Sequence, residues 1–117
     1  MKIIIAGAGE VGFHLAQLFS YESHEITLID LDEERLDYAN KHLDIRTSIG
    51  DATIPSTLKE ADVANAEMLI AVTSSQSINI SVCVFAKQMG AARTVARVSN
   101  QELLENEDVI ESKTFNY

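Results

Sequence analysis

Hydrophobic and polar positions follow two alternating patterns along this chain, with short apolar runs separated by amphipathic stretches. Short runs of β-branched and aliphatic residues indicate buried strands, and apolar positions three or four residues apart indicate helices. The predicted strands cover residues 2–6, 25–29, 44–48, 68–72 and 94–98. The predicted helices cover residues 10–21, 32–41, 56–61, 76–89 and 100–106.

The helical spacing also predicts which side chains face the core. In the helix over 10–21 the expected inward stripe is Val11, Leu15, Leu18 and Phe19. In the helix over 32–41 the expected inward residues are Leu36 and Ala39. In the helix over 76–89 they are Ile78, Val82, Phe85, Ala86 and Met89. Pro55 or Ser56 is expected to begin the helix over 56–61. Gly90 is expected to stop the helix over 76–89.

Regular alternation of strand and helix with short loops predicts an α/β domain with a parallel sheet and right-handed crossovers. We expect a Rossmann-like, doubly wound sheet with strand order 3-2-1-4-5, and a ligand over the carboxyl ends of strands 1 and 4. The length of 117 residues leaves room for one domain, residues 1–117. Residues 114–117 resemble the start of a sixth strand that is cut short, so we expect the chain to be a fragment of a longer protein.

The turn after the first strand carries the main candidate site, with the sequence Gly7-Ala8-Gly9-Glu10-Val11-Gly12. Gly7 permits a tight turn, Gly9 lets the backbone approach a pyrophosphate, and Gly12 lets the helix pack closely on the strand. The N-terminus of that helix offers free N–H groups and a positive dipole end. The motif alone is weak evidence, but a strand before it and a helix, strand and acid after it make it a specific dinucleotide-binding signal.

Asp30 ends the second strand, where a carboxylate can accept hydrogen bonds from a ribose diol. It would repel a 2′-phosphate, and neither Leu31 nor Asp32 supplies an arginine to hold one. NAD(H) or an adenosine phosphate is therefore favoured over NADP. The alternative is that Asp30 only caps the following helix.

Several further positions are candidate ligand contacts, and most of them have two readings. Glu10 either points toward the phosphate region, which disfavours a triphosphate, or faces solvent in the first helical turn. Asp51, after Gly50, either lies beside the adenine or caps the next helix. The hydroxyls of Thr73-Ser74-Ser75 cap the helix over 76–89, bond to ribose or phosphate, or do both. Within that helix Asn79 could reach the cleft, whereas Arg97 on the last strand serves either the ligand or an interface.

Composition narrows the function classes. Eighteen acids against nine bases give a net charge of −9, which argues against nucleic-acid binding. No apolar run is long enough to span a bilayer, and no signal peptide is indicated. The single cysteine, Cys83, suits a reducing compartment and is expected to fill the core. No histidine has an acid partner at a suggestive spacing, no metal-ligand cluster is present, and no nucleophile elbow is present. Binding without catalysis is the simpler reading.

The ordered motifs carry a family resemblance. The glycine turn, Leu28-Ile29-Asp30-Leu31-Asp32-Glu33-Glu34-Arg35, Gly50-Asp51-Ala52-Thr53, Ala71-Val72-Thr73-Ser74-Ser75 with Asn79, and Val95-Ala96-Arg97-Val98 follow one another along the chain. This series resembles the N-terminal nucleotide-binding domain, called RCK or KTN, of the regulatory subunits of Trk/Ktr potassium uptake systems. The resemblance covers nearly the whole chain.

The resemblance implies a cytoplasmic, non-catalytic nucleotide sensor at the inner face of the plasma membrane. Such domains form dimers that build rings beneath a membrane-embedded potassium channel or transporter, and NAD(H) or ADP/ATP binding shifts the ring between states. The resemblance implies that Gly7, Gly9 and Gly12 lie against the phosphates. It implies that Asp30 binds the adenosine ribose and that Asp51 lies on the adenine side. With the motif positions, the candidate cofactor-binding set is Gly7, Ala8, Gly9, Glu10, Val11, Gly12, Asp30, Leu31, Arg35, Asp51, Ala52, Thr73, Ser74, Ser75, Asn79 and Arg97.

One position departs from part of the family. Some members that respond to ATP carry an arginine in the glycine turn, and this chain has Glu10 there. NAD(H) is therefore the favoured ligand, with ADP or ATP as alternatives. Two other readings stay open: the cofactor domain of an NAD-dependent oxidoreductase that lacks its substrate domain, and a Rossmann-type interaction module that has lost its ligand.

Overall fold

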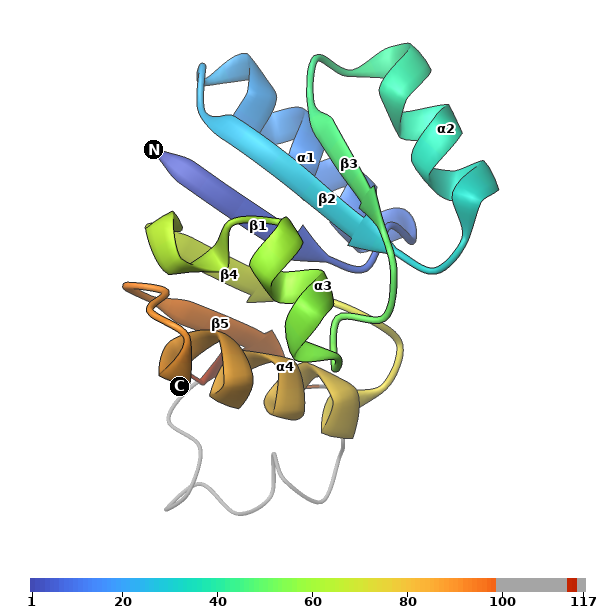
Figure 1. Ribbon diagram of the computed structural model, residues 1–117. Helices are drawn as coiled ribbons and strands as arrows, with labels where there is room; N and C mark the ends of the chain where they lie inside the picture. The colour runs from blue at the N-terminus through green and yellow to red at the C-terminus, as the bar shows by residue number, and fades with distance from the viewer. Residues whose placement is uncertain (99–113, 116–117) are drawn as a thin grey trace.

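The computed structural model describes residues 1–98 and 114–115 (Figure 1). Its strands are β1 (Lys2–Ala6), β2 (Glu25–Asp30), β3 (Arg46–Ile49), β4 (Met68–Ala71), β5 (Thr94–Arg97) and β6 (Thr114–Phe115). Its helices are α1 (Glu10–Tyr21), α2 (Glu33–His42), α3 (Pro55–Glu60), the 3₁₀ helix η1 (Val63–Asn65) and α4 (Gln76–Gln88). The predicted helix over 100–106 and the end of the predicted sixth strand, 116–117, lie outside the described residues.

The strands form one sheet in the order β3-β2-β1-β4-β5-β6. The first five are parallel, and β6 pairs antiparallel with β5. The predicted Rossmann-like order 3-2-1-4-5 is therefore confirmed, and a sixth strand begins at Thr114 as expected. From β1 the chain adds β2 and β3 on one side of the sheet and then returns to add β4 and β5 on the other side. The switch point therefore lies between β1 and β4.

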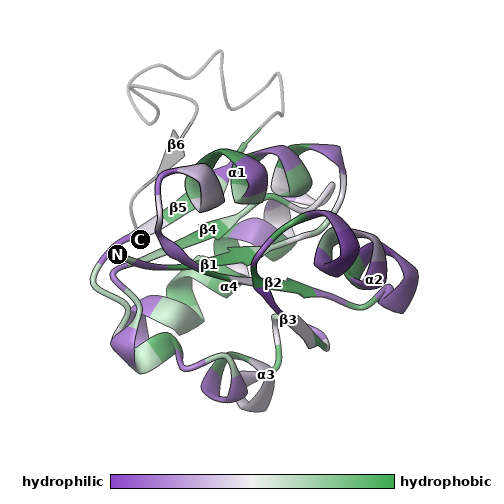
Figure 2. Ribbon diagram, turned by 90° about the horizontal axis from the view of Figure 1, so that it is seen from above, coloured by the Kyte–Doolittle hydropathy of each residue, from purple (hydrophilic) through white to green (hydrophobic). Residues whose placement is uncertain are grey.

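Helices cover both faces of the sheet, and β1 is buried between them (Figure 2). Its alternate side chains enter two different hydrophobic clusters. Ile4 and Ala6 pack with residues of α3 and α4, whereas Ile3 and Ile5 pack with residues of α1 and α2. All four are at most 1% exposed, which explains why the strand reads as a continuous apolar run.

The predicted inward stripe of α1 is partly wrong. Leu15 and Phe19 pack partly against the core, but Val11 is 38% exposed and Leu18 is 53% exposed. The fully buried positions are instead Gly12 and Ala16, one turn apart. The helix lies so close to the sheet that only small side chains fit on the line of contact, and larger ones are displaced to its sides.

The other helices agree better with the hydropathy pattern. Leu36 and Ala39 of α2 are buried, and so are Val82 and Ala86 of α4. Ile78 is the exception on α4, since it is 40% exposed. Pro55 begins α3, and Gly90 follows the end of α4 with a φ of +115°. The η1 helix had no sequence prediction, and β3 begins two residues later than predicted because residues 43–45 still form the turn after α2.

Cys83 is fully buried on α4 and is the free cysteine of the described residues. Burial raises the pKa of its thiol to about 11, so it is protonated at neutral pH. The expectation of a core cysteine is confirmed. Among the described helices, none has the length and apolar character that crossing a bilayer requires.

Candidate functional site

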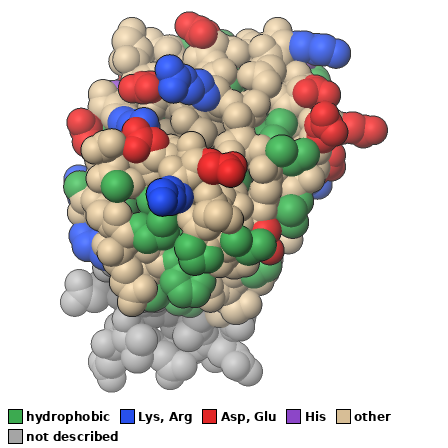
Figure 3. Space-filling model, viewed as in Figure 1, with side chains coloured by type: hydrophobic (Ala, Val, Ile, Leu, Met, Phe, Trp, Pro, Cys, Tyr) green, Lys and Arg blue, Asp and Glu red, His purple; other side chains and the backbone are tan. Residues whose placement is uncertain are grey.

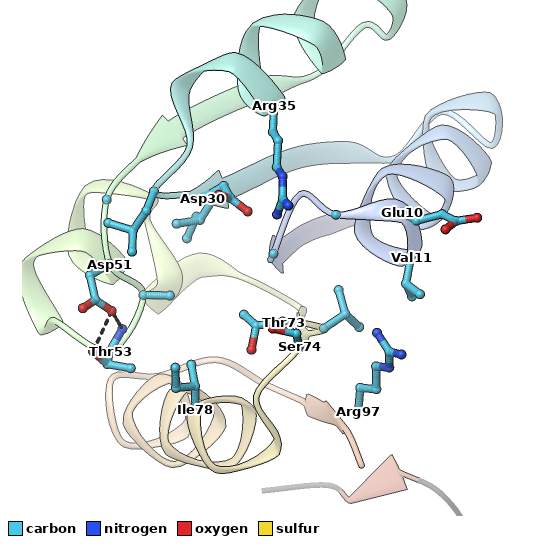
Figure 4. A pocket seen from close by; sticks show the side chains of 17 residues that line it. Glu10, Val11, Asp30, Arg35, Asp51, Thr53, Thr73, Ser74, Ile78 and Arg97 are labelled. Atoms are coloured by element: carbon cyan, nitrogen blue, oxygen red, sulfur yellow. Dashed lines mark hydrogen bonds between the residues drawn. The ribbon is translucent and has the colours of Figure 1, made fainter. Parts of the chain in front are cut away.

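A cleft of about 570 Å³ opens over the carboxyl ends of β1, β2 and β4, at the switch point of the sheet (Figure 4). Most of the predicted site residues line it, and they come from the ends of the parallel strands and from the loops and helix starts that follow them. The predicted lining residues are Gly7, Gly9, Glu10, Val11, Asp30, Leu31, Arg35, Asp51, Ala52, Thr73, Ser74 and Arg97. The sequence therefore predicted the position and most of the lining of this cleft.

The glycine turn at the centre of the cleft is shaped by close backbone contacts. Gly7 has a φ of +114°, a left-handed conformation that favours glycine. A Cβ there would lie 3.0 Å from the backbone nitrogen of Thr73, so the turn rests directly on the end of β4. At Gly9 the nearest atom to an added Cβ is Nη1 of Arg35, at 3.8 Å. The backbone at Gly9 thus borders open space where a ligand can approach.

The start of α1 faces this open space. Gly9 is the N-cap residue and contributes no side chain to the cap. The first N–H groups of a helix have no partner within the helix, and the dipole adds partial positive charge there. These donors, together with the space beside Gly9, form an arrangement suited to a phosphate group.

Asp30 bridges the glycine turn and the loop after β2. Its Oδ2 accepts a hydrogen bond of 2.7 Å from the N–H of Ala8, and its Oδ1 accepts one of 2.8 Å from the N–H of Asp32. The N-cap of α2 is Asp32, whose carboxylate accepts from the N–H of Glu34. Asp30 therefore does not cap α2, and its carboxylate fixes the edge of the cleft beside the glycine turn.

Asp51 lies on the same side of the cleft, in the loop after β3. Its Oδ1 accepts hydrogen bonds from both the hydroxyl of Thr53, at 2.6 Å, and the N–H of Thr53, at 2.9 Å. These bonds hold the pKa of Asp51 below its ordinary value, with the hydroxyl bond as the larger cause. The N-cap of α3 is Ile54, so Asp51 orders the preceding turn and does not cap the helix.

The Asp51–Thr53 contact predicts a pH-dependent stability. Because the folded state favours the ionised carboxylate, the stabilisation is present above the ordinary pKa of 3.8 and is lost as the pH falls below it. We expect Thr53→Val to be less stable than the wild type at pH 7, by a small amount because the pair is near solvent, and this difference to shrink at pH 3. Urea unfolding at both pH values measures it, with the exposed Ser56→Ala as the control. Equal differences at both pH values would contradict the assignment.

Two arginines give the middle of the cleft its positive charge. Arg35 reaches from α2 over the glycine turn, and Arg97 extends from the end of β5 on the opposite side (Figure 4). Arg35 makes a long ion pair with Asp32, with 3.6 Å between Nε and Oδ2. Arg97 is exposed, so its charge needs no buried acidic partner. Glu10 is exposed in the first turn of α1, next to the N-cap residue Gly9.

Four predicted residues lie outside the cleft lining. Ala8 borders a neighbouring groove between α1 and α2, and Gly12 packs against Gly7 beneath the turn. Ser75 caps α4, where its hydroxyl accepts from the N–H of Ile78 at 3.3 Å. Asn79 is buried beneath the cleft and bonds to backbone groups around it. Their direct contact with a ligand stays a prediction.

Five lining residues were missed by the sequence analysis: Ile29, Gly50, Thr53, Val72 and Ile78. Four of them lie within the sequence motifs that carry the family resemblance, and this position could have identified them: Ile29, Gly50, Thr53 and Val72. Ile78 was assigned to the core of α4 but instead presents a partly exposed apolar side chain to the cleft. In the part of the chain that the structure describes, no group of three or more His, Cys, Asp or Glu side chains gathers as a metal site would require.

Comparisons with solved structures agree with this architecture. The GsuK channel bound to NAD matches with a TM-score of 0.76 at 16% identity, over 96% of this chain and 20% of that one. The Kef C-terminal domain of Shewanella denitrificans, in its AMP-bound form, matches with a TM-score of 0.72 at 19% identity, over 94% of this chain and 69% of that one. At these identities the likeness concerns the fold.

The sequence comparisons are closer. The Trk system potassium uptake protein TrkA of Halomonas elongata is 42% identical over 99 residues, which are 84% of this chain and 22% of that protein. The chain spans about a quarter or less of the length of the first relatives it matches. The family model of the TrkA-N domain matches residues 3–113. With this match over nearly its whole length, and with the glycine turn and acids in place, the chain belongs to the TrkA-N family.

Proposed function

We propose that this chain is the nucleotide-binding unit of a regulatory protein in a Trk/Ktr-type potassium uptake system. The observation that carries the proposal is the glycine turn held against Asp30 in a cleft at the switch point of the sheet. The relative from Halomonas elongata is named as a potassium uptake protein, which supports this assignment. The proposed role is regulatory and not enzymatic. In this role, nucleotide binding would favour one conformation of the protein over another.

The proposed ligand is NAD(H), with ADP and ATP as the alternatives. The cleft runs from Asp51 on one side, past the glycine turn and Arg35, to Arg97 on the other, so it offers polar partners on both sides of the phosphates. The NAD bound to the GsuK channel and the AMP bound to the Kef domain support a nucleotide of this class. Glu10 disfavours a third phosphate near the start of α1, which places ATP second.

We also propose that copies of the chain associate, and that the assembly acts at the cytoplasmic face of a membrane-embedded potassium pore. Exposed apolar side chains gather on the face formed by α3 and α4 (Figure 3). The large aliphatic side chains exposed by more than a third there are Ile54, Ile78 and Val84. Apolar surface of this kind favours contact with another protein surface. The mass in solution, measured by light scattering, tests whether copies associate.

Calorimetric titration of the chain with NADH, NAD, ADP and ATP tests the ligand assignment. We expect NAD(H) to bind more tightly than ATP. Failure of all four nucleotides to bind would refute the proposed function. In the full-length protein, a helical substrate domain would favour the alternative, an oxidoreductase cofactor domain, whereas a second glycine-rich repeat would support the proposed function.

The variant Gly9→Ala tests the phosphate position within that cleft. We expect it to fold, because the added Cβ has 3.8 Å to its nearest neighbour. It should weaken NADH binding by about tenfold or more, since the methyl group occupies the space through which a phosphate meets the backbone N–H groups. Calorimetry measures the affinity and circular dichroism checks the fold. An unchanged affinity would place the phosphates elsewhere.

A further inference from the structure

Asn79 is a polar side chain with 1% exposure, located one turn into α4 and directly beneath the cleft. Burying a side-chain amide is costly unless its donors and acceptors are all paired. It is not among the residues that line the cleft. Any role of Asn79 in the cleft therefore depends on the residues to which its amide is hydrogen-bonded.

All four hydrogen-bonding positions of the Asn79 amide are used. Its Oδ1 accepts from the N–H of Thr73 at 2.9 Å and from the hydroxyl of Thr73 at 2.6 Å. Its Nδ2 donates to the carbonyl of Thr73 at 3.1 Å and to the carbonyl of Arg97 at 3.0 Å. Two donors and two acceptors surround the amide, so only an asparagine in this orientation satisfies every group.

These bonds join two parts of the cleft just beyond the ladder between β4 and β5, whose last paired residues are Ala71 and Ala96. Thr73 follows the end of β4, and Arg97 is the last residue of β5. Both belong to the second half of the doubly wound fold. Asp30 and Asp51, the candidate adenosine contacts, belong to the first half, built on β1, β2 and β3. A dinucleotide needs both halves, whereas AMP needs only the first.

We propose that Asn79 is a positioning residue that holds Thr73 and Arg97 in place for the second nucleotide of a dinucleotide, and so favours NAD(H) over AMP. This inference rests on the proposed function, because it concerns the same cleft. The bonds to Thr73 fix the backbone and hydroxyl of a residue that lines the cleft, and the bond to the carbonyl of Arg97 fixes where its side chain leaves β5. Without the amide, these groups lose their common anchor while the first half of the cleft keeps its own bonds.

The test compares the dissociation constants of NADH and AMP for the wild type, Asn79→Ala and Val82→Ala. For Asn79→Ala we expect NADH to bind about tenfold more weakly, while AMP affinity changes by less than about twofold. Val82→Ala empties a fully buried site one turn further along α4 and controls for general destabilisation of the helix. It should lower the melting temperature but leave the ratio of the two affinities unchanged.

A second variant keeps the inference testable if Asn79→Ala does not fold. Thr73→Val removes the hydroxyl that donates to Asn79 Oδ1 but preserves the side-chain volume. We expect Thr73→Val to weaken NADH binding selectively as well. Asn79→Ser, a milder change at the same site, allows a double variant with Thr73→Val. Because both changes remove the same contact, the double variant should lose no more NADH affinity than the weaker-binding of the two single variants. Equal weakening of NADH and AMP, or no change in NADH affinity, would overturn the inference while leaving the proposed function intact. A wild type that binds neither nucleotide would overturn both.

Discussion

Gly12→Ala is expected to lower the free energy of unfolding by about 3 kcal/mol or more, the largest stability effect that the described residues predict. The added Cβ would lie 1.7 Å from the carbonyl oxygen of Gly7 and 2.8 Å from its carbonyl carbon. Both are backbone atoms of the turn, so neither can move aside as a flexible side chain would. The helix must shift away from β1, which opens the contact between Gly12, Ala16 and the sheet.

Helix propensity makes this result a sharp test. Alanine is more favourable than glycine within a helix by about 1 kcal/mol, so in the absence of a clash the substitution would stabilise α1. Thermal or urea unfolding measures the change, and Gly9→Ala serves as the matched control because its Cβ meets nothing closer than 3.8 Å. A Gly12→Ala variant as stable as the wild type would mean that α1 does not pack on the turn as described.

The strands and their order were predictable because they depend on patterns that are local in sequence. The run Ile3-Ile4-Ile5 is buried on both faces, and only a central parallel strand has that environment. Strand–helix alternation then fixes the direction of the strands and the hand of their connections. The cleft follows from the same topology, since Gly7 and Thr73 meet wherever β1 and β4 are neighbours.

What the sequence did not reveal depends on close packing and on partners far along the chain. Hydropathy placed Val11 inward, but the close approach of α1 at Gly12 leaves it partly exposed on the cleft. The sequence suggested that Asn79 could reach the cleft but not that its amide would bond to Thr73 and to the carbonyl of Arg97, eighteen residues away. Periodicity carries no information about such a pairing. Arg35, known from the sequence only as a motif position, lies over the glycine turn.

The two halves of the cleft are anchored in different ways, and this separates the expected effects of their mutations. On the first side, Asp30 contacts the glycine turn directly through the N–H of Ala8. On the second side, Thr73 and Arg97 are held from beneath by Asn79. We therefore expect a change at Asp30 to affect every ligand that carries an adenosine ribose, and a change at Asn79 to affect only those that extend past the phosphates.

Asp30→Ala is expected to weaken NADH binding by roughly 10- to 100-fold, the largest effect on affinity that the site predicts. Two losses combine. The ribose diol loses its carboxylate partner, and the N–H groups of Ala8 and Asp32 lose the acceptor that holds the glycine turn to the edge of the cleft. AMP, which carries the same ribose, should weaken by a similar factor, in contrast to the selective effect expected at Asn79.

The same variant should also change which dinucleotide is preferred. In the proposed site the carboxylate of Asp30 would repel a 2′-phosphate, so its removal should narrow the preference for NADH over NADPH even as NADH itself binds more weakly. Calorimetric titration with NADH, NADPH and AMP measures all three effects, and Asp44→Ala, at an exposed acid outside the cleft, controls for the loss of one negative charge. An NADH affinity that matches the Asp44→Ala control would remove Asp30 from the ribose site. A retained preference against NADPH would mean that another group excludes the 2′-phosphate.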